Sequence, residues 1–412
     1  MSLFSRKPKE TASITYVSHT GASQTFDVPL GTSVMEGGVR NGVEEIVAEC
    51  GGAGLRAVGL RSIGGDSLER IANSASRVGG DPRLLLGQMR ENLAMLPAIR
   101  DELREMWKAE RPDLVVADSV APVGGLVCDE LGIPWITTIA TPFAIENRSG
   151  VPAYCGGWRP GFAARDAVGR WFIRTFKRAV AWYFRREFGL LGGRFPYRED
   201  GTERIYSARA ILGFGIRELE FPRDWPGCFE MLGPVMDCPE AGPLLDFPVG
   251  SKRVLVSVGT HLLWAKRTLV EDVVALAREF AGVEFVVSMG GEGEGVRRVC
   301  EGVTVYPFVP YARDLGVFDA VIHHGGAGVT YAAILCGVPA VVVPHDYDQF
   351  DYAARVKFLG VGLRARSVRG AGGALRAVLE KKTWPELERM REAALRYRPG
   401  ERFLEVVREF VS

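Results

Sequence analysis

The ten residues V-I-H-H-G-G-A-G-V-T, at 321–330, combine a short apolar run, two histidines and a cluster of glycines. We expect a buried strand that ends at His324, a turn over 325–328 and a helix that begins near Val329. Glycines let the backbone approach a ligand closely, and the N–H groups at a helix N-terminus point at an anion. The stretch therefore predicts a phosphate-binding corner, with a tight turn that holds no ligand as an equally weighted alternative.

Short apolar runs alternate with helical patterns along the chain from Pro112 onward. Continuous apolar runs of this length are typical of strands that helices cover on both faces of a parallel sheet. The sequence therefore predicts doubly wound α/β organisation in two sets, which a Pro- and Gly-rich stretch at 232–243 separates. The expected strands are 112–118, 132–140, 253–260, 283–289, 319–324 and 338–344.

The N-terminal segment does not follow this alternation. The stretch S-I-T-Y-V-S-H-T-G-A-S-Q-T-F-D-V-P, at 13–29, predicts two strands joined by a turn at Thr20 and Gly21. A helix that Thr32 or Ser33 caps is expected to follow. The order is thus β-β-α, where a doubly wound domain would begin β-α-β.

Length and composition narrow the class of protein. The chain has 412 residues, which predicts more than one domain, and a net charge of +1, which implies no polyelectrolyte partner. Its seven cysteines include no C-x-x-C pair, which indicates a reducing cytoplasm without a disulfide framework or a zinc site. The N-terminus lacks the apolar core of a signal peptide, and no apolar run is long enough to span a membrane.

A second loop carries polar chemistry next to the glycine corner. In V-P-H-D-Y-D-Q-F, at 343–350, Asp348 and Gln349 follow the next expected strand. A carboxylate accepts hydrogen bonds and an amide both donates and accepts, which suits the hydroxyls of a sugar. The alternative is a solvated turn acid, and the pairing of the two loops makes it less favoured.

Residues 254–363 resemble the donor domain of family-one glycosyltransferases with the GT-B fold, the UDP-glycosyltransferase superfamily. The motifs V-S-V-G-T, F-V-P, H-H-G-G-A-G and D-Q occur in the order and spacing of that family. The resemblance implies two facing doubly wound Rossmann-like domains. It also implies transfer of a hexose from a UDP- or TDP-sugar to a hydroxyl of a small lipophilic acceptor, with inversion. No metal is expected at D-Y-D, 346–348, because helix N–H groups stabilise the leaving diphosphate in this fold.

The resemblance also assigns roles to residues of this chain. His324 would contact the donor diphosphate, Phe308 would stack on the base, and Asp348 would hold sugar hydroxyls. Val329 stands where the family has a hydroxyl residue, so one hydrogen bond of about 1 kcal/mol is lost and weaker donor binding is expected. Tyr352 also replaces the usual Asn. The expected donor-site residues are Gly259, Thr260, Phe308, Val309, His324, Gly325, Gly326, Ala327, Gly328, Val329, Asp348 and Gln349.

The acceptor half is expected to supply the catalytic base. Asp118 ends the strand P-D-L-V-V-A-D, where the family keeps an aspartate that orients a basic histidine. The alternative is an acid that only caps the next helix. His19 is the only histidine of the N-terminal half and could serve as the base by position. A surface histidine of the hairpin is the favoured alternative.

Residues 13–53 resemble the N-terminal part of a [2Fe-2S] ferredoxin of the adrenodoxin or putidaredoxin type. In that family Cys50 would be the first cluster ligand, and the next two would stand where this chain has Arg56 and Gly59. A cluster of this type needs four thiolates, so no iron–sulfur cluster is expected. From residue 55 the transferase resemblance resumes, without its first two βα units.

The expected organisation is a ferredoxin-like fragment at 1–54, an acceptor domain at 55–235 and a linker at 236–252. A donor domain at 253–390 and a C-terminal helix at 391–412 that crosses back to the acceptor domain complete the chain. Two alternative functions stay open. One is a catalytically impaired nucleotide-sugar-binding protein, and the other, less favoured, is a fused [2Fe-2S] electron carrier.

Basic and aromatic residues alternate at 158–197, which contains W-F-I-R-T-F-K-R-A-V-A-W-Y-F-R-R-E-F. At helical spacing they predict a basic amphipathic helix suited to peripheral contact with an anionic membrane, at its inner face. An aromatic-lined acceptor pocket is an equally weighted alternative. A nucleic-acid partner is not expected, because the rest of the chain is not basic.

Overall fold

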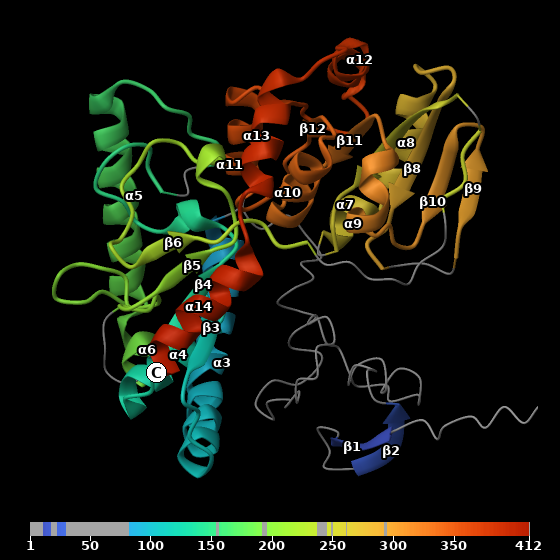
Figure 1. Cartoon of the computed structure of the whole chain (residues 1–412). Helices are drawn as coiled ribbons and strands as arrows, with labels where there is room; N and C mark the ends of the chain where they lie inside the picture. Colours follow the sequence, from blue (N-terminus) through green and yellow to red (C-terminus); the bar gives the residue numbers. More distant parts are fainter. Residues whose placement is uncertain are drawn as a thin grey trace, which may run out of the picture. The chain divides into compact units, whose positions relative to one another are not determined.

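The computed structural model describes the backbone of Thr11–Val17 and Ser23–Pro29 and most of 82–411. Residues 154–155, 192–195, 237–244, 249, 261 and 292–294 are the gaps in that last range. The chain divides into two compact units, Met1–Ala72 and Asn73–Ser412 (Figure 1).

The first unit contains the expected hairpin. Strands β1 (Thr11–Val17) and β2 (Ser23–Pro29) pair antiparallel, with Thr11 opposite Pro29 and Val17 opposite Ser23. The predicted strand pair is thereby confirmed. The turn, the helix after it, His19 and Cys50 lie outside the described residues.

The second unit contains two parallel sheets. The larger one has seven strands in the order β13-β12-β11-β7-β8-β10-β9, and all its neighbours are parallel except β9 and β10. The predicted strands of the C-terminal half are therefore confirmed, and the short antiparallel strand β9 is an addition at the edge. The strands are β7 (Lys252–Ser257), β8 (Val283–Ser288), β9 (Arg297–Cys300), β10 (Val303–Tyr306), β11 (Ala320–His323), β12 (Ala340–Val342) and β13 (Gly362–Arg364).

Helices cover both faces of this sheet, as doubly wound organisation requires. Leu255 and Val321 face one core with α10, α11 and α13, whereas Val254 and Ile322 face the opposite core with α8 and α12. This alternation is the reason that the strands read as continuous apolar runs. The helices are α7 (Leu263–Lys266), α8 (Leu269–Ala277), α9 (Tyr311–Asp314), η3 (Leu315–Val317), α10 (Ala327–Cys336), α11 (Gln349–Phe358), α12 (Gly372–Glu380) and α13 (Pro385–Leu395).

The smaller sheet has four parallel strands in the order β3-β4-β5-β6. Strand β3 forms its edge among the described residues, where a full doubly wound domain would continue. The strands are β3 (Val115–Asp118), β4 (Trp135–Ile139), β5 (Ile211–Gly213) and β6 (Phe229–Met231). The helices of this half are α3 (Pro82–Ala109), α4 (Val123–Leu131), η1 (Pro142–Ala144), α5 (Ala163–Tyr183), α6 (Arg185–Leu190) and η2 (Arg217–Leu219).

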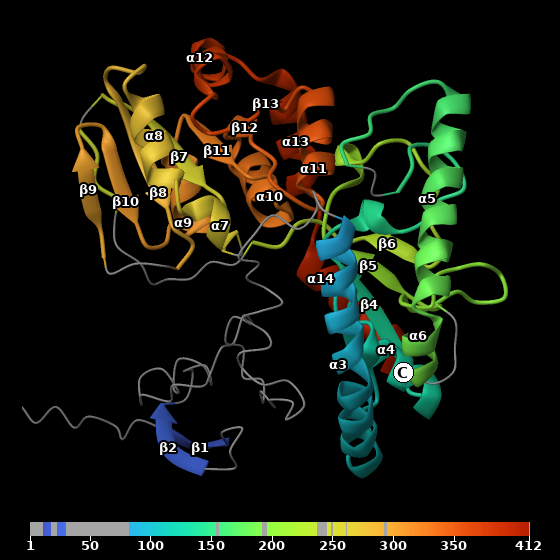
Figure 2. The ribbon, with the colours of Figure 1, turned by 180° about the vertical axis from the view of Figure 1, so that it is seen from behind.

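The last helix, α14 (Pro399–Val411), packs on the smaller sheet (Figure 2). Val406 joins a core with Ile136 of β4 and Leu212 of β5. Arg402 binds both carboxylate oxygens of Glu230 on β6, at 2.6 and 2.9 Å. The C-terminal helix therefore returns to the half of the unit that contains α3 and the smaller sheet.

The two halves of the second unit share one apolar core. Phe143 and Leu219 of the first half pack with Tyr331, Tyr352 and Val356 of the second half. Such a core fixes the carboxyl ends of the two sheets with respect to each other. In the part of the chain that the structure describes, no helix combines the length and apolar character of a membrane span.

Candidate functional site

The ring of His324 lies between two glycines at the carboxyl end of the larger sheet. A Cβ atom on Gly259 would lie 2.7 Å from His324 Cε1, and one on Gly326 would lie 2.5 Å from His324 Nε2. Gly259 also has a φ of +79°, which favours glycine. The loop after β7 and the loop after β11 therefore meet around one imidazole, and only glycines leave room for it.

The glycine corner forms a strand, turn and helix, as expected from the sequence. The strand ends at His323, one residue earlier than predicted, and α10 begins at Ala327 rather than near Val329. The helix begins earlier because Gly326 is extended, with φ −67° and ψ 154°, and its carbonyl accepts the first helical hydrogen bond, from Thr330 N. The N–H groups of the first turn thus have no helical acceptor and can face an anion.

His323 stabilises this corner from inside. Its Nδ1 accepts a hydrogen bond of 3.0 Å from the N–H of Gly325, whose φ is +97°. Burial, and secondarily the neighbouring His324, lowers the pKa of His323 to about 3. His323 is therefore a neutral structural residue, and His324 is the histidine at the surface of the corner.

The side chain of Val329 is buried in the core that the two halves share. Only its backbone N–H is in position to serve the first turn of α10. The hydroxyl of Thr330 is not a substitute for the missing hydroxyl, because it donates to Gly326 O at 2.7 Å.

Two further loops join the corner on the side of β8 and β10. A Cβ atom on Gly290 would lie 2.5 Å from Gly259 O, and the N–H of Gly291 donates to Pro307 O at 2.7 Å. Phe308 follows with its ring partly exposed, whereas Val309 is fully buried. The ring of Phe308 is therefore accessible at the end of this loop, and Val309 anchors the loop.

The loop after β12 joins the corner on the opposite side. A Cβ atom on Gly325 would lie 2.9 Å from Gln349 O. The Oε1 atom of Gln349 accepts hydrogen bonds from the N–H groups of His345 and Asp346, at 2.8 and 3.0 Å. The amide oxygen therefore shapes the loop, which leaves the amide NH₂ group as the part of Gln349 suited to a ligand.

Asp348 faces the other half of the unit. Its Oδ2 accepts a hydrogen bond of 2.7 Å from the hydroxyl of Thr141, which follows β4. Burial raises the pKa of Asp348 above its usual value. Among the described residues, no group of three or more His, Cys, Asp or Glu side chains is arranged to hold a metal ion.

Asp118 lies at the carboxyl end of β3 and is held on both oxygens. Oδ1 accepts the N–H of Val120 at 2.9 Å, and Oδ2 accepts the hydroxyl of Thr138 at 3.0 Å. Thr138 belongs to β4, which leads directly to Thr141. Asp118 therefore lies at the carboxyl edge of the smaller sheet, where its side chain holds the turn after β3, whereas α4 begins after Pro122 without a side-chain cap. His19 lies outside the described residues.

Three residues of this region were not predicted from the sequence as site residues. Thr141 contacts Asp348, and the hydroxyl of Tyr352 donates to Ala140 O at 2.8 Å. The buried Lys266 donates from Nζ to Thr260 O at 2.9 Å and brings a cation under the loop after β7. Of the three, only Lys266 could have been found from the sequence, because it stands in an apolar helical stretch directly after V-S-V-G-T.

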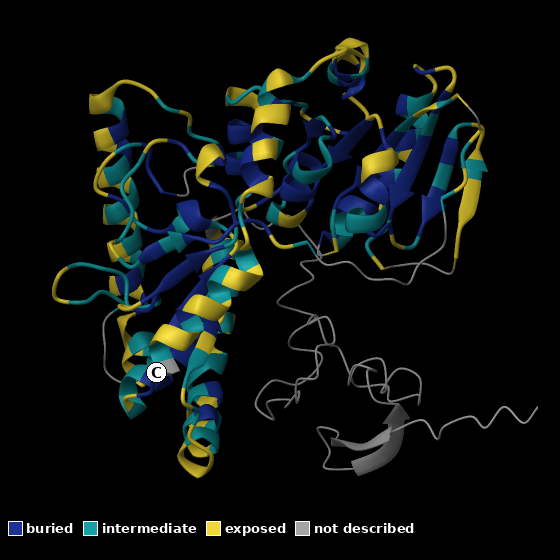
Figure 3. Cartoon of the chain, in the orientation of Figure 1, coloured by how far each residue is buried: buried dark blue, intermediate teal, exposed yellow. Residues whose placement is uncertain are grey.

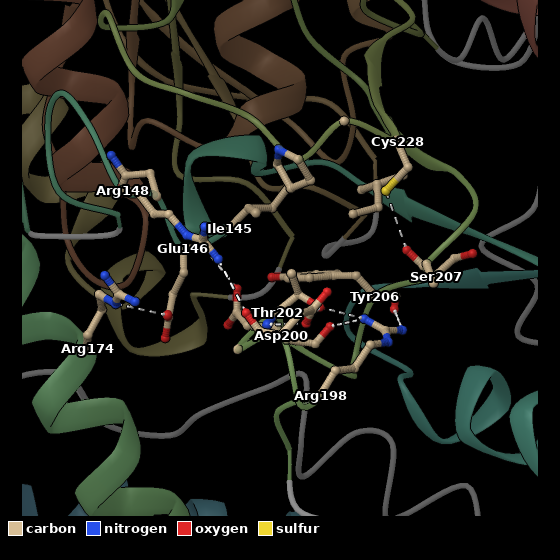
Figure 4. Close-up of a pocket in the computed structure, with 17 residues that line it drawn as sticks. Ile145, Glu146, Arg148, Arg174, Arg198, Asp200, Thr202, Tyr206, Ser207 and Cys228 are labelled. Carbon is tan, nitrogen blue, oxygen red and sulfur yellow. Dashed lines mark hydrogen bonds and ion pairs between the residues drawn. The ribbon is translucent and has the colours of Figure 1, made fainter.

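A separate cavity of about 300 Å³ opens in the first half (Figure 4). Ile211 and Cys228 line it near the amino ends of β5 and β6, so it belongs to the edge opposite the glycine corner. Arg198 crosses its wall and donates to the carbonyls of Glu203 and Tyr206. None of the predicted site residues lines this cavity.

Comparison with known proteins agrees with the fold. Residues 271–400 match the family model "Erythromycin biosynthesis protein CIII-like, C-terminal domain". The glycotransferase of kitacinnamycin superposes with a TM-score of 0.60 at 19% identity, covering 82% of this chain and 86% of that one. A spinosyn rhamnosyltransferase complexed with thymidine diphosphate superposes with a TM-score of 0.53 at 20% identity, over 79% and 81%.

Two curated relatives extend the similarity over most of the chain. The zeaxanthin glucosyltransferase of Pantoea ananas is 26% identical over 330 residues, which covers 75% of this chain and 74% of that protein. The O-mycaminosyltylonolide 6-deoxyallosyltransferase of Streptomyces fradiae is 29% identical over 362 residues, covering 79% and 83%. The chain is a glycosyltransferase of the GT-B fold. In this glycosyltransferase the larger sheet forms the C-terminal Rossmann-like domain, and His324 marks the edge that faces the N-terminal one.

Proposed function

We propose that this glycosyltransferase moves a hexose from a UDP- or TDP-sugar to a hydroxyl of a small lipophilic acceptor. The observation that carries the proposal is the imidazole of His324, which Gly259 and Gly326 enclose at the N-terminus of α10. Backbone N–H groups, a helix N-terminus and one imidazole are what a diphosphate requires.

The corner would stabilise the leaving nucleoside diphosphate without a metal. As the acceptor oxygen bonds to the anomeric carbon, the bond from that carbon to the diphosphate oxygen breaks, and negative charge grows on the diphosphate. N–H groups of Gly326, Ala327, Gly328 and Val329 would face that charge, and His324 would contact it from the side. Donors fixed in place before the reaction are effective because they need no reorganisation.

The remaining donor contacts follow from the loops on either side. Phe308 would stack on the base, next to Gly259 and Thr260 on the phosphate side. Asp348 and the amide NH₂ group of Gln349 would bind sugar hydroxyls. The thymidine diphosphate bound by the related spinosyn enzyme supports a TDP-sugar as one donor.

The acceptor would enter from the N-terminal half and react with inversion by direct displacement. The zeaxanthin glucosyltransferase relative supports a lipophilic acceptor. We assign Asp118 as the residue that orients the base and His19 as the candidate base that takes the hydroxyl proton. The position of Asp118 supports this role, since its partner Thr138 lies on β4 and Thr141, the partner of Asp348, follows the carboxyl end of that strand.

A nucleotide-sugar-binding protein without transfer activity is the second candidate. Both oxygens of Asp118 already accept hydrogen bonds from its own neighbourhood, and residues 82–260 contain no histidine. Formation of a glycoside from a lipophilic alcohol, lost in His19→Ala, would exclude this candidate. Donor binding without product would support it.

The direct test is thermal unfolding of the full chain with millimolar UDP or TDP. A nucleotide at a hundred times its Kd stabilises the folded chain by about 2.7 kcal/mol, which raises Tm by several degrees. We expect a rise with at least one nucleotide and a smaller rise in His324→Ala. No rise with either nucleotide would contradict the proposed donor site.

An iron assay separates these proposals from an electron carrier. The resemblance at 13–53 provides Cys50, but Arg56 and Gly59 stand where thiolates would be needed. We expect no bound iron and no visible absorption from a cluster. About two iron atoms per purified chain would contradict this expectation.

A further inference from the structure

Helix α5 turns three of its basic residues toward the protein. Arg170, Arg174 and Lys177 are spaced so that they share one face of the helix. Arg170 donates to Gly150 O, and Lys177 forms an ion pair of 2.8 Å with Glu203. Figure 4 shows Arg174 pointing toward the carboxylate of Glu146, at 3.8 Å. These charges hold the helix on the N-terminal domain.

The opposite face of α5 is apolar and exposed. Trp171, Phe172 and Phe176 lie on it, and Trp171 keeps 67% of its surface in contact with solvent. The rings of Phe172 and Phe176 stack with their centroids 6.5 Å apart, and Trp182 continues the face with 62% exposed. Figure 3 shows exposed residues along this helix. The amphipathic helix expected from the sequence is present, and its apolar side is the outward one.

An exposed band of this kind is unusual on a globular protein. Single apolar residues are common at a surface, but contiguous aromatic residues on one helix face mark an interaction site. The band needs an occupant that removes these rings from water.

The charges around the band favour an anionic occupant. The only acidic residue of α5 is Asp166, which is buried and accepts the indole N–H of Trp158 at 3.0 Å. Arg178 is exposed on the helix, and Arg185 and Arg186 are exposed just beyond its end. The guanidinium of Arg185 lies 4.5 Å from the ring of Trp182, so cation and aromatic ring present one combined surface.

We propose that the outward face of α5 docks on an anionic lipid bilayer. Trp171, Phe172, Phe176 and Trp182 enter the interfacial layer, where tryptophan is favoured. The basic residues at the C-terminal end of the helix bind the lipid headgroups. The inference rests on α5 and the first residues of α6, and it does not depend on the proposed transfer reaction.

The docked face is linked to the donor domain. The loop before α5 reaches α11, because the N–H of Gly156 donates to Asp351 Oδ2 at 3.0 Å. A bilayer bound to α5 would therefore lie against a helix whose preceding loop is hydrogen-bonded to α11. Helix α11 in turn begins at Gln349, one of the proposed sugar-binding residues.

Sedimentation with vesicles tests the docking. The full chain is mixed with vesicles of phosphatidylcholine alone, and with vesicles of equal parts phosphatidylcholine and phosphatidylglycerol. We expect the bound fraction to be high only on the mixed vesicles and to fall as salt increases. The variant Trp171→Ser/Phe172→Ser/Phe176→Ser should bind at least about tenfold more weakly, because these rings supply the buried apolar area. Leu404→Ser removes an exposed apolar residue from α14 and should bind like the wild type.

A variant that removes basic residues tests the docking independently of the aromatic variant. Arg178→Gln/Arg185→Gln/Arg186→Gln should weaken binding to the mixed vesicles at least about tenfold, since each basic residue near the surface contributes separately. Arg396→Gln, which removes an exposed arginine elsewhere, should have little effect. This variant decides the question even where the aromatic variant fails to fold.

Three results would overturn the proposal. The first is equal binding of the wild type to both vesicle types or to neither. The second is unchanged binding of both the aromatic and the charge variants. The third is a dimer in analytical ultracentrifugation that the aromatic variant converts to monomer while vesicle binding stays the same, which would identify a second copy of the chain as the occupant.

Discussion

The hydroxyl of Thr141 donates a hydrogen bond of 2.7 Å to Asp348 Oδ2 and so connects the two Rossmann-like domains at the proposed sugar site. Thr141 follows the carboxyl end of β4, and Asp348 precedes α11. The contact orients one carboxyl oxygen toward the N-terminal domain. The second oxygen is then the one that can accept a hydroxyl of the sugar.

Thr141→Val should weaken binding of the intact nucleotide sugar more than binding of the free nucleotide. The variant leaves a partly buried carboxyl group without its donor, and a hydrogen bond to such a group is worth about 1.5 to 3 kcal/mol. Calorimetry with UDP-glucose or TDP-glucose should therefore show a loss of at least about tenfold in affinity. Thr141→Ser keeps the donor and should retain the affinity. Equal losses in the two variants, or an equal loss for UDP alone, would contradict this role.

The sequence predicted the glycine corner well because its signals are local. The apolar residues Val321 and Ile322 face opposite cores of one buried strand, and Gly325 needs a left-handed φ that few other residues adopt. Each of these requirements restricts the residue types at neighbouring positions of the sequence. The expected order of strand, turn and helix was therefore confirmed to within two residues of its boundaries.

Contacts between residues that are distant in the sequence have no such local pattern. Thr141 and Asp348 are 207 positions apart, and nothing next to Thr141 indicates its partner. The direction in which α5 faces was equally hidden. The apolar face of a helix is normally turned toward the core. Here Glu146 and Glu203 bind basic residues of α5, so the basic face is turned inward and the apolar face outward. The orientation of α5 could be predicted only with the positions of those carboxylates in the fold.

The ion pair of Arg355 and Glu220 should be essential for the stability of the joined domains. The two groups are 2.9 Å apart, and their side chains are 4% and 3% exposed. The guanidinium also lies 3.9 Å from the ring centre of Phe143. Arg355→Met would leave a buried carboxylate unpaired, so we expect the free energy of unfolding to fall by about 3 to 5 kcal/mol.

Urea unfolding of Arg355→Met measures this loss, and an exposed ion pair provides the control. Arg389 and Glu386 are 3.0 Å apart, but the Arg389 side chain is 72% exposed. Arg389→Met should cost less than about 1 kcal/mol, because solvent screens the pair. Similar losses in the two variants would show that the buried pair has no special role.

His323 should make the folded protein less stable in acid. Its pKa is lowered to about 3 by burial and by His324, whereas the unfolded chain takes up the proton near pH 6.5. As the pH falls below about 6.5, the unfolded state binds a proton that the folded state does not, so stability decreases by up to about 1.4 kcal/mol per pH unit. The loss continues until the pH reaches the folded pKa.

The variant His323→Asn isolates this contribution. Asparagine offers an oxygen to the N–H of Gly325 but does not titrate. The free energy of unfolding, measured between about pH 7 and about pH 5, should fall less steeply in the variant than in the wild type. Identical slopes would mean that His323 is protonated in the folded state as readily as in the unfolded state.

Gly326→Ala should impair nucleotide binding by displacing His324. The added Cβ would lie 2.5 Å from His324 Nε2, although the backbone of Gly326 suits any residue. We expect UDP or TDP to bind at least about tenfold more weakly, since the lost contact is a charged hydrogen bond. Gly373→Ala is the matched control, because Gly373 lies in the first turn of α12 with open space around its Cβ position. If the alanine acts only through the imidazole, then adding Gly326→Ala to His324→Ala should cause little further loss of affinity. Additive losses would show instead that the alanine disturbs the N–H groups of α10, and that His324 and the helix bind the diphosphate independently.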